Sequence, residues 1–377
     1  MSFFLSENHK RHAQVYQHVA ELMRPYWQQL ERQEKIPDEV IEILRQYKLL
    51  GIPMPEKYGG GGKDYLSGAM CIEYLSKTNP SVAGVINVTT ELVSVPILKN
   101  ASDFLKDKYL TPLASGASIG AFGLTEPNAG SDTSAAETTA VKKDGHWVLN
   151  GRKKFITNAE LADIFLVGAV TELPDGRRKI SEFIVEKSFP GFSLGKIERK
   201  MGIRASSTGE LVFENCIVPE ENLVGTLGKG LSYALNALEY GRVMIAAQAV
   251  GIAQGAIDET VAALKEKNSE RLSRQWVQFK LAELQTKTEA ARLMVYRAAA
   301  KADTGENFGM ESSQAKLFAS ETANEVTRAC VDILGAEGCM KDTLAELMFR
   351  DAKITEIYEG TNEIQRLIIA GNMELKG

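Results

Sequence analysis

The order in which two patterns of apolar residues follow one another constrains the fold more than any other feature of the sequence. Residues 1–118 and 231–377 carry apolar side chains at three-to-four-residue spacing, the period of a helix buried on one face. Residues 119–230 instead contain short runs of β-branched and aromatic residues separated by turn signals. We therefore expect a helical N-terminal domain over 1–118, a β domain over 119–230 and a helical C-terminal domain over 231–377.

The middle segment shows no helical pattern between its candidate strands. An antiparallel sheet or a small barrel is therefore expected rather than βαβ units. Asn150-Gly151 and Pro174-Asp175-Gly176 are hairpin or turn signals. The candidate strands are residues 119–122, 146–149, 164–167, 183–185 and 211–213.

The helical segments contain both short and long candidates. Pro37 is placed to start a helix that includes residues 39–44, and the glycine run at 59–62 must be a loop. Long helices joined by short links predict a bundle in the C-terminal segment. The long candidates are residues 244–267, 275–303 and 310–334, and residues 104–113 form a further helix near the end of the N-terminal segment.

Composition excludes several kinds of site and partner. The only histidines are His9, His12, His18 and His146, and none of the four cysteines forms a CxxC pair, so we expect neither a histidine-dependent nucleophile nor a metal site. The chain has a net charge of −5 and no basic stripe that would indicate nucleic-acid binding. No uncharged apolar run approaches the ~18 residues of a membrane-spanning helix. With no visible secretory signal, we expect a cytoplasmic protein with free thiols. An enzyme of this composition would combine a carboxylate base with a cofactor.

The first motif is residues 123–132, GLTEPNAGSD, which follows a strand-like run. Its small residues let backbone N–H groups approach an anion, and Thr125 and Ser131 add hydroxyl donors. These properties suit a pyrophosphate, but they also suit a polar turn at a domain boundary. The motif is neither a P-loop nor a GxGxxG fingerprint.

The second motif is Phe155-Ile156-Thr157-Asn158. An aromatic face beside a hydroxyl donor could stack on and hydrogen-bond a flat heterocycle. The alternative is an ordinary strand end.

The third motif, residues 357–366, contains Glu359 directly before Gly360. A carboxylate at a helix break can reach into a cleft, where partial desolvation raises its pKa toward the range of a general base. The alternative is a capping or surface glutamate.

In this order the three motifs resemble the acyl-CoA dehydrogenase family, and the resemblance covers nearly the whole chain, including residues 55–60 and 241–254. The resemblance implies an α+β fold that is mainly α. Such a fold has an N-terminal helical domain, a middle antiparallel β domain and a C-terminal four-helix bundle. It also implies a homotetramer or homodimer, with FAD between the β domain and the bundle.

Matching the family's motifs residue by residue implies roles for individual side chains. Glu359 matches the catalytic base, and Arg242 matches a position that contacts substrate and steadies the base. Thr157 would lie near flavin N5. The implied FAD contacts are Phe122, Leu124, Thr125, Gly130, Ser131, Phe155, Ile156, Thr157, Asp332, Gly335, Thr361 and Glu363, and the implied substrate contacts are Ser131, Glu239, Arg242, Gly360 and Glu91.

The resemblance also implies the reaction. The base takes the α-proton of an acyl thioester and the flavin takes the β-hydride, while hydrogen bonds to the thioester carbonyl stabilise the developing enolate. The backbone amide at Glu359 and a flavin ribityl hydroxyl would donate these hydrogen bonds. The substrate would be a thioester of CoA or of an acyl carrier protein. The electron acceptor would be an electron-transfer flavoprotein or a similar protein, in fatty acid metabolism.

Two stretches depart from the family's pattern. Residues 265–274 lack the Arg-x-x-Phe-Gly stretch with which most members touch the FAD of a neighbouring subunit, although Lys267 or Arg271 could supply the charge. In residues 332–339, Ala336 replaces one of two adjacent glycines. Both departures weaken the implied FAD contact across a subunit interface. They resemble branches of the family that act on carrier-protein thioesters in polyketide pathways.

Three functions remain open from the sequence. A flavin dehydrogenase of acyl thioesters is the leading hypothesis, an oxidase that uses O₂ is a second, and a non-catalytic binding protein derived from the family is a third. Retention of Glu359, Arg242 and the whole loop at 123–132 favours an enzyme.

Glu91 is a carboxylate within a mostly apolar run at 88–98, the segment that matches a family helix beside the acyl pocket. It either faces solvent or another domain, or lies with Thr90 at the acyl end of the pocket. An uncompensated buried carboxylate needs hydrogen-bond donors. We therefore predict a preference for short or polar acyl groups.

Overall fold

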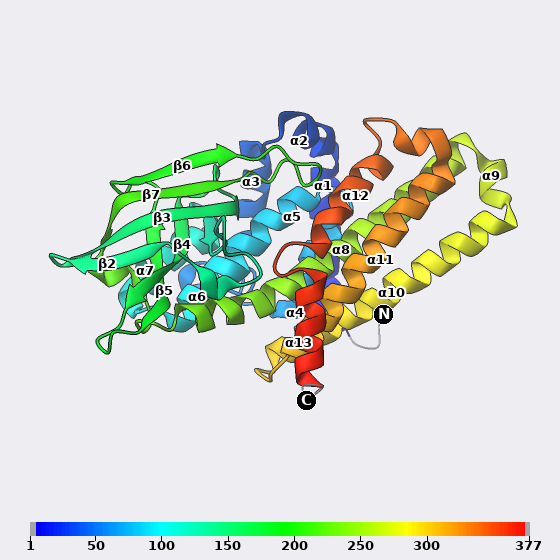
Figure 1. The fold of residues 1–377 in the computed structure, drawn as a ribbon. Coiled ribbons are helices and arrows are strands. Elements are labelled where there is room, and N and C mark those ends of the chain that lie inside the picture. The colour runs from blue at the N-terminus through cyan, green and yellow to red at the C-terminus, as the bar shows by residue number, and fades with distance from the viewer. Residues whose placement is uncertain (1–4, 374–377) are drawn as a thin grey trace.

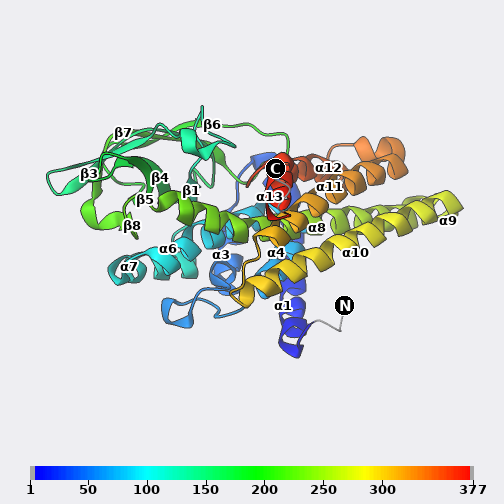
Figure 2. The ribbon, with the colours of Figure 1, turned by 60° about the horizontal axis from the view of Figure 1, so that its bottom comes forward.

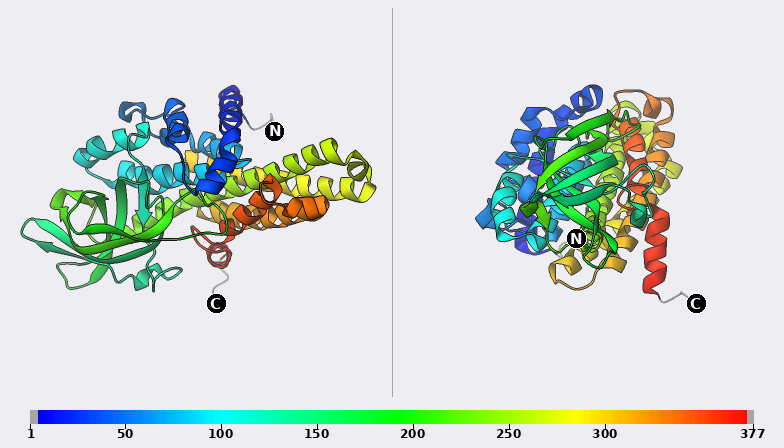
Figure 3. Two further views of the ribbon diagram at one scale, coloured as in Figure 1. Left: turned by 90° about the horizontal axis from the view of Figure 1, so that it is seen from above. Right: turned by 60° about the vertical axis from the view of Figure 1, so that its left-hand side comes forward.

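A computed structural model describes residues 5–373 of the chain. Along the chain, helices come first, a β-sheet follows, and further helices come last (Figure 1). The sheet lies at one end of the molecule and a bundle of long helices extends away from it (Figure 3). The N-terminal helices are α1 (Glu7–Met23), α2 (Trp27–Gln33), α3 (Asp38–Gln46), α4 (Tyr65–Ser76), α5 (Pro80–Asn87), α6 (Val95–Asn100) and α7 (Asp103–Ser115).

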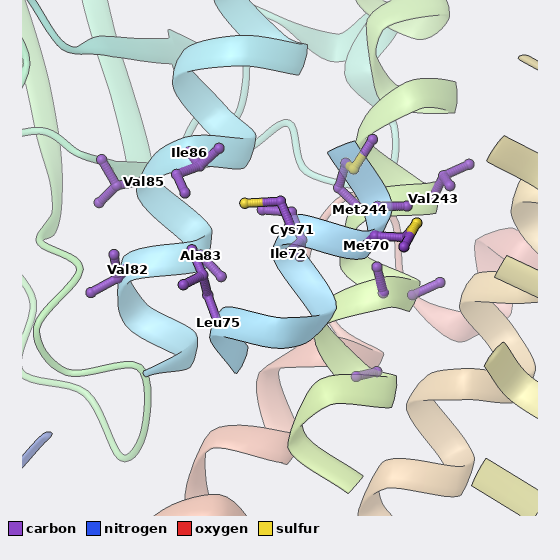
Figure 4. Close-up of a cluster of buried hydrophobic side chains, with 14 of the residues drawn as sticks. Met70, Cys71, Ile72, Leu75, Val82, Ala83, Val85, Ile86, Val243 and Met244 are labelled. Atoms are coloured by element: carbon purple, nitrogen blue, oxygen red, sulfur yellow. The ribbon is translucent and has the colours of Figure 1, made fainter. Parts of the chain in front are cut away.

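A continuous helix of three parts runs through the N-terminal region over residues 80–100. Its middle part, η4 (Val88–Ser94), is a π-helix, a local form that is rare and frequent at functional sites. The helix is long and apolar enough to cross a membrane, but 94% of its most apolar window is buried inside the protein. It is therefore packed as a core helix. Figure 4 shows α5 beside α4, and Val243 and Met244 of α8 (Gly230–Lys267) beside Met70 of α4.

The β-sheet has eight strands in the order β6-β7-β3-β2-β4-β5-β8, and β1 pairs with β4. The antiparallel prediction holds for most neighbours, but β4 pairs in parallel with both β1 and β2. The strands are β1 (Gly120–Gly123), β2 (Thr139–Lys143), β3 (His146–Thr157), β4 (Ile164–Glu172), β5 (Arg178–Glu186), β6 (Phe192–Ile197), β7 (Thr208–Pro219) and β8 (Leu223–Val224).

The prediction of a turn at Asn150-Gly151 is wrong. Both residues lie inside β3, at a register shift against β7. Gly151 has φ 145°, and a Cβ there would lie 2.5 Å from Oγ1 of Thr138, so the glycine serves a close approach of two chain segments. The hairpin turn is instead Asp144-Gly145, with φ 49° and 77° between the paired ends of β2 and β3. Asp-Gly is a strong two-residue turn signal that the sequence already contained.

The C-terminal helices form the predicted bundle with one boundary moved. α8 starts at Gly230 rather than at Met244, so it reaches from the sheet to the far end of the bundle (Figure 2). α10 and α11 match their predicted ranges closely. The other helices are α9 (Ser269–Ser273), α10 (Gln275–Asp303), α11 (Gly309–Leu334), α12 (Leu344–Ala352) and α13 (Asn362–Asn372).

Candidate active site

Glu359 lies on the turn between the short helix η8 (Lys353–Glu356) and α13. Its backbone is left-handed, with φ 52°, and Gly360 follows at φ 93°. A non-glycine residue in this conformation is held there by its surroundings at some cost in energy. The Oε1 atom accepts a hydrogen bond from Nδ2 of Asn87 at 2.7 Å. The Oε2 atom is buried and has no hydrogen-bond partner among the described residues.

Gly241 of α8 makes the space that the carboxyl group occupies. A Cβ on Gly241 would lie only 2.0 Å from Oε2 of Glu359. Any larger residue would therefore displace the carboxyl group. The free oxygen is positioned by the absence of a side chain on the facing helix.

Three side chains from the bundle hold the turn. Nε of Arg242 donates to the carbonyl oxygen of Glu359 at 3.4 Å. Nζ of Lys316 donates to the carbonyl oxygen of Gly360 at 2.9 Å, and Nε2 of Gln365 donates to the same oxygen at 2.9 Å. Because the positions of Glu359 and Gly360 are fixed from α8, α11 and α13, the carboxyl group points in one direction.

Burial raises the pKa of Glu359 to about 7, although the hydrogen bond from Asn87 and the charges of Arg242 and Lys316 oppose the shift. Burial also lowers the pKa of Lys316 to about 8. A carboxyl group that titrates near neutral pH and has one unpartnered oxygen suits a general base.

A second carboxyl group, that of Glu91, lies close to the first. Glu91 is 2% exposed on the π-helix, and its Oε2 is buried without a partner among the described residues. It lines a small cavity together with Asn87, the residue that bonds Glu359. Burial, followed by the charge of Glu359, raises the pKa of Glu91 to about 8, and Lys99 opposes this shift. Glu91 therefore does not face solvent.

The loop between β1 and β2 is built around a buried ion pair. Oε1 of Glu126 lies 2.5 Å from Nζ of Lys153, and Oε2 accepts from the backbone N–H of Glu137 at 2.6 Å. The charge of Lys153 and these hydrogen bonds lower the pKa of Glu126 against the effect of its burial. Nζ of Lys153 also donates to the carbonyl oxygen of Leu124 at 3.1 Å, and Leu124 itself is buried. The pair therefore fixes the loop from inside and leaves its outer face free.

The outer face of this loop carries the residues that sequence analysis assigned to a phosphate. Gly130 and Ser131 are exposed, Thr125 is partly exposed, and no atom lies within 4 Å of where a Gly130 Cβ would stand. Phe122, at the start of the loop, packs against Val88 and other residues of a small apolar cluster.

The second motif lies at the end of β3, where a further register shift separates Lys153 from Ile156. Phe155 has φ 59° and its side chain is 58% exposed. A bulky residue held in this conformation with a solvent-facing ring is unusual. Ile156 is buried in the sheet core, so only its backbone can face a ligand, whereas Thr157 is partly exposed.

The remaining predicted residues divide into two groups. Thr361 and Glu363 are at the start of α13 beside Gly360, and Glu239 lies one turn before Arg242 on α8. Asp332 and Gly335 lie elsewhere, at the far end of the bundle, where a Cβ on Gly335 would be 3.3 Å from Nη1 of Arg271 (Figure 1). Within one chain the structure does not bring this second group to the loop at 123–132.

Sequence analysis missed Asn87 and Lys316, and it did not assign Gly241 a role. Asn87 carried a signal, since it is a polar residue within the apolar run that precedes Glu91. Lys316 carried none, because a lysine on a helix is ordinarily exposed. Among residues 5–373, no group of three or more His, Cys, Asp and Glu side chains is arranged to hold a metal ion.

Comparison with known proteins gives matches along almost the whole chain. The models of the acyl-CoA dehydrogenase N-terminal, middle and C-terminal domains match residues 6–117, 121–216 and 228–374. The short-chain specific acyl-CoA dehydrogenase of Clostridium acetobutylicum is 43% identical over 377 residues, covering 99% of this chain and 100% of the relative. An acyl-CoA dehydrogenase of Bacillus subtilis is 46% identical over 344 residues, covering 90% and 91%.

Solved structures agree. Butyryl-CoA dehydrogenase of Megasphaera elsdenii superposes with a TM-score of 0.95 at 39% identity, covering 99% of this chain and 100% of that one. A chain from work on the electron transferring flavoprotein of Acidaminococcus fermentans has a TM-score of 0.95 at 41% identity and covers 99% of both. An acyl-CoA dehydrogenase of Bacillus anthracis complexed with FAD has a TM-score of 0.91 at 35% identity, covering 99% of this chain and 68% of that one.

Proposed function

The chain belongs to the acyl-CoA dehydrogenase family, and we propose that it catalyses the FAD-dependent α,β-dehydrogenation of an acyl thioester with Glu359 as the base. The observation that carries the assignment of the base is the Oε2 atom of Glu359, which is buried and has no hydrogen-bond partner in the part of the chain that the structure describes. Asn87 occupies Oε1, so Oε2 is the atom that receives the proton. No other described carboxyl group combines this geometry with a strained turn and a matching family position.

The residues present fit FAD. Phe155 offers an exposed ring on a bulge, and Thr157 offers a hydroxyl group two residues later. These would hold the flavin ring, and Thr125, Gly130 and Ser131 would hold the phosphates through hydroxyl and backbone N–H donors. Bound FAD supplies the hydride acceptor.

The chain's own residues carry the proton transfer. Oε2 of Glu359 forms a bond to the α-proton as the α C–H bond breaks, and the electron pair that is left becomes the π-bond as the β-hydride departs. Arg242 and Lys316 place positive charge near the carboxyl group and hold the carbonyl oxygens of Glu359 and Gly360. The turn therefore keeps its shape while the charge of the carboxyl group changes. Glu239 and Ser131 are the further positions proposed to contact substrate.

The substrate carrier and the electron acceptor follow from the relatives. Several relatives are named as short-chain acyl-CoA dehydrogenases, which supports a short acyl group on CoA over a carrier protein. The similarity to a chain studied with an electron transferring flavoprotein supports a protein of that kind as the acceptor. A homotetramer, with Asp332 and Gly335 contributed to FAD of a neighbouring subunit, and a cytoplasmic role in fatty acid metabolism belong to the same proposal.

Anaerobic reduction of the bound flavin tests the function. The purified yellow protein is mixed with butyryl-CoA and with butyryl carrier protein, and the loss of flavin absorbance is followed. The wild type should bleach, and faster with the CoA thioester. Steady H₂O₂ release in air would identify an oxidase instead, and no bleaching with any thioester would favour a binding protein.

The Glu359→Gln variant tests the base. It should keep FAD and the fold but lose flavin reduction by about 10²–10⁴-fold, the usual contribution of a general base. Glu321→Gln, a change of the same kind at an exposed position of α11 that pairs with Arg366 of α13, is the control for surface charge near the site. Near-normal reduction by Glu359→Gln would exclude this residue as the base.

A further inference from the structure

The cavity beside Glu359 contains two hydrogen-bond acceptors that nothing in the described chain satisfies. Oε2 of Glu91 is buried without a partner, and so is Oδ1 of Asn87. The two residues are four apart on one continuous helix, so they lie on the same face, and both line the cavity. Nδ2 of Asn87 is already committed to Glu359, which leaves its oxygen pointing elsewhere.

The neighbouring donors are engaged with other groups. The hydroxyl of Thr90, which also lines the cavity, donates to the carbonyl oxygen of Leu50 at 3.0 Å. Nζ of Lys99 donates to the hydroxyl of Tyr240 at 2.7 Å and contacts Oδ1 of Asn236 at 3.4 Å. The charge of Lys99 therefore lowers the free-energy cost of ionising Glu91, although Lys99 forms no hydrogen bond to it.

The other walls of the cavity are apolar. Ile72 of α4 and Met244 of α8 line it, and Figure 4 shows both side chains between α4, α5 and α8. A buried acceptor without a donor is costly in such surroundings. The cavity has a volume of about 10 Å³, room for one water-sized group, and a terminal methyl group there would leave both oxygens unpaired. A group that carries a hydrogen-bond donor would satisfy at least one of them.

We propose that this cavity receives the hydroxyl group at the distal end of a short acyl group, and that this hydroxyl donates its hydrogen bond to Glu91 or to Asn87. This inference rests on the proposed function, since Asn87 both lines the cavity and donates a hydrogen bond to the carboxyl group of the proposed base. It deepens that function by naming a substrate class, short hydroxyacyl thioesters with the hydroxyl beyond the β-carbon.

The hydroxyl takes no part in bond changes. The α-proton passes to Oε2 of Glu359, bound FAD would supply the acceptor for the β-hydride, and the product is a 2-enoyl thioester that retains its hydroxyl group. A hydroxyl suits Glu91 in either protonation state, because it can donate to the carboxylate or accept from the carboxylic acid. Since burial raises the pKa of Glu91 to about 8, both states are within reach near neutral pH.

The test compares 4-hydroxybutyryl-CoA with pentanoyl-CoA, whose acyl groups have the same number of non-hydrogen atoms. The wild-type holoenzyme should show a kcat/KM at least about tenfold higher for the hydroxyacyl thioester, because the alkyl analogue leaves buried acceptors unpaired. Glu91→Leu, an apolar change of similar size, should reverse the preference. Glu91→Gln, which keeps one acceptor oxygen, should retain part of it.

Glu182→Leu is the matched control. Glu182 of β5 is also buried, and both of its carboxyl oxygens lack partners among the described residues, but it lies in the sheet rather than in the cavity. This variant should keep the wild-type ratio of the two substrates. If both Glu91 variants and the control changed the ratio alike, the effect would be one of general stability and the proposal would be wrong.

Binding without turnover gives an independent measurement. In Glu359→Gln, titration calorimetry should show 4-hydroxybutyryl-CoA binding more tightly than pentanoyl-CoA by a similar factor. A wild type that prefers pentanoyl-CoA, or a ratio unaffected by Glu91→Leu, would overturn the proposal while leaving the dehydrogenase function in place. Failure of butyryl-CoA as well to reduce the flavin would instead overturn the function on which the proposal rests.

Discussion

At the scale of single residues, the carboxyl group of Glu359 depends on what surrounds it more than on its own chemistry. A glutamate on a surface turn is fully ionised at neutral pH, and its pKa is near 4.5. Here burial raises the pKa, Gly241 gives the group its space and Asn87 binds one of its two oxygens. The other oxygen is left free to accept a proton.

The raised pKa of Glu359 predicts how the reaction depends on pH. Only the ionised carboxylate can take a proton, so the rate of flavin reduction should rise as pH increases through about 7 and then level off. Stopped-flow reduction at saturating substrate between pH 5.5 and 9 measures this profile. A profile that is flat across neutral pH would contradict the role of Glu359, whatever the rate.

The same shift has a consequence for stability. Between pH 4.5 and about 7 the native state keeps the proton of Glu359 and the unfolded chain has lost it, so this group's contribution to stability falls as pH rises through that window. Glu359→Gln lacks the titration. Its melting temperature relative to the wild type should therefore increase over the window, which thermal scans at several pH values would measure.

At the scale of elements, irregular segments bring the functional side chains to one region. The π-helix η4 turns Glu91 inward, and the register shift at the end of β3 turns Phe155 outward. Oδ1 of Asn158 is buried without a partner within residues 5–373, while its Nδ2 donates to the carbonyl oxygen of Gly120 at 2.9 Å and joins the ends of β3 and β1. Deviations of this kind cost energy in a regular element and concentrate at sites where geometry matters.

The loop between β1 and β2 supports a prediction about FAD. Ser131 is exposed on the outer face of the loop, so Ser131→Ala should leave the stability of the apoprotein unchanged. It should weaken FAD binding by about 1–3 kcal/mol if the hydroxyl is the donor to a desolvated phosphate oxygen. Ser193→Ala removes an exposed serine of β6, in the same β domain, and is the control. Fluorescence titration of apoprotein with FAD measures both variants, and equal dissociation constants would remove Ser131 from the site.

At the scale of the whole molecule, buried polar groups tie the N-terminal helices to the bundle. Nε of Arg292 on α10 donates to Oε1 of Glu73 on α4 at 2.7 Å, and Nη2 donates to Oε1 of Gln254 on α8 at 2.9 Å. The hydroxyl of Tyr296 donates to the second oxygen of Glu73 at 2.9 Å. This network joins three helices that are far apart in the sequence.

Breaking that network should affect stability strongly. Arg292→Met leaves the carboxylate of Glu73 buried without its cation, which costs about 3–5 kcal/mol. Adding Glu73→Gln should recover part of the loss, because the remaining group is then neutral. Lys10→Met, which breaks the exposed pair of Lys10 with Glu7, should change stability by about 1 kcal/mol or less. Denaturant midpoints with saturating FAD compare the variants, and similar shifts for Arg292→Met and Lys10→Met would contradict this account.

The sequence alone predicted the order of the helical and β segments, the long helices and the three motifs. Periodicity and turn chemistry are local properties, and α10 and α11 lie where their apolar periods predicted. The wrong prediction at Asn150-Gly151 shows the limit of local signals. Gly151 is needed because Thr138 packs closely against it, and only the folded chain brings the two residues together. The true turn at Asp144-Gly145 had its own local signal.

Tertiary structure alone decided the chemistry of the site. Residues 87, 241 and 316 come from three separate helices. They decide which oxygen of Glu359 is free and how far the pKa of Glu359 is raised, and the packing of these helices decides whether Glu91 is buried. Burial and charge act through space, so their effects cannot be computed from positions along a chain. The sequence therefore identified the candidate base, and packing made that base able to act near neutral pH.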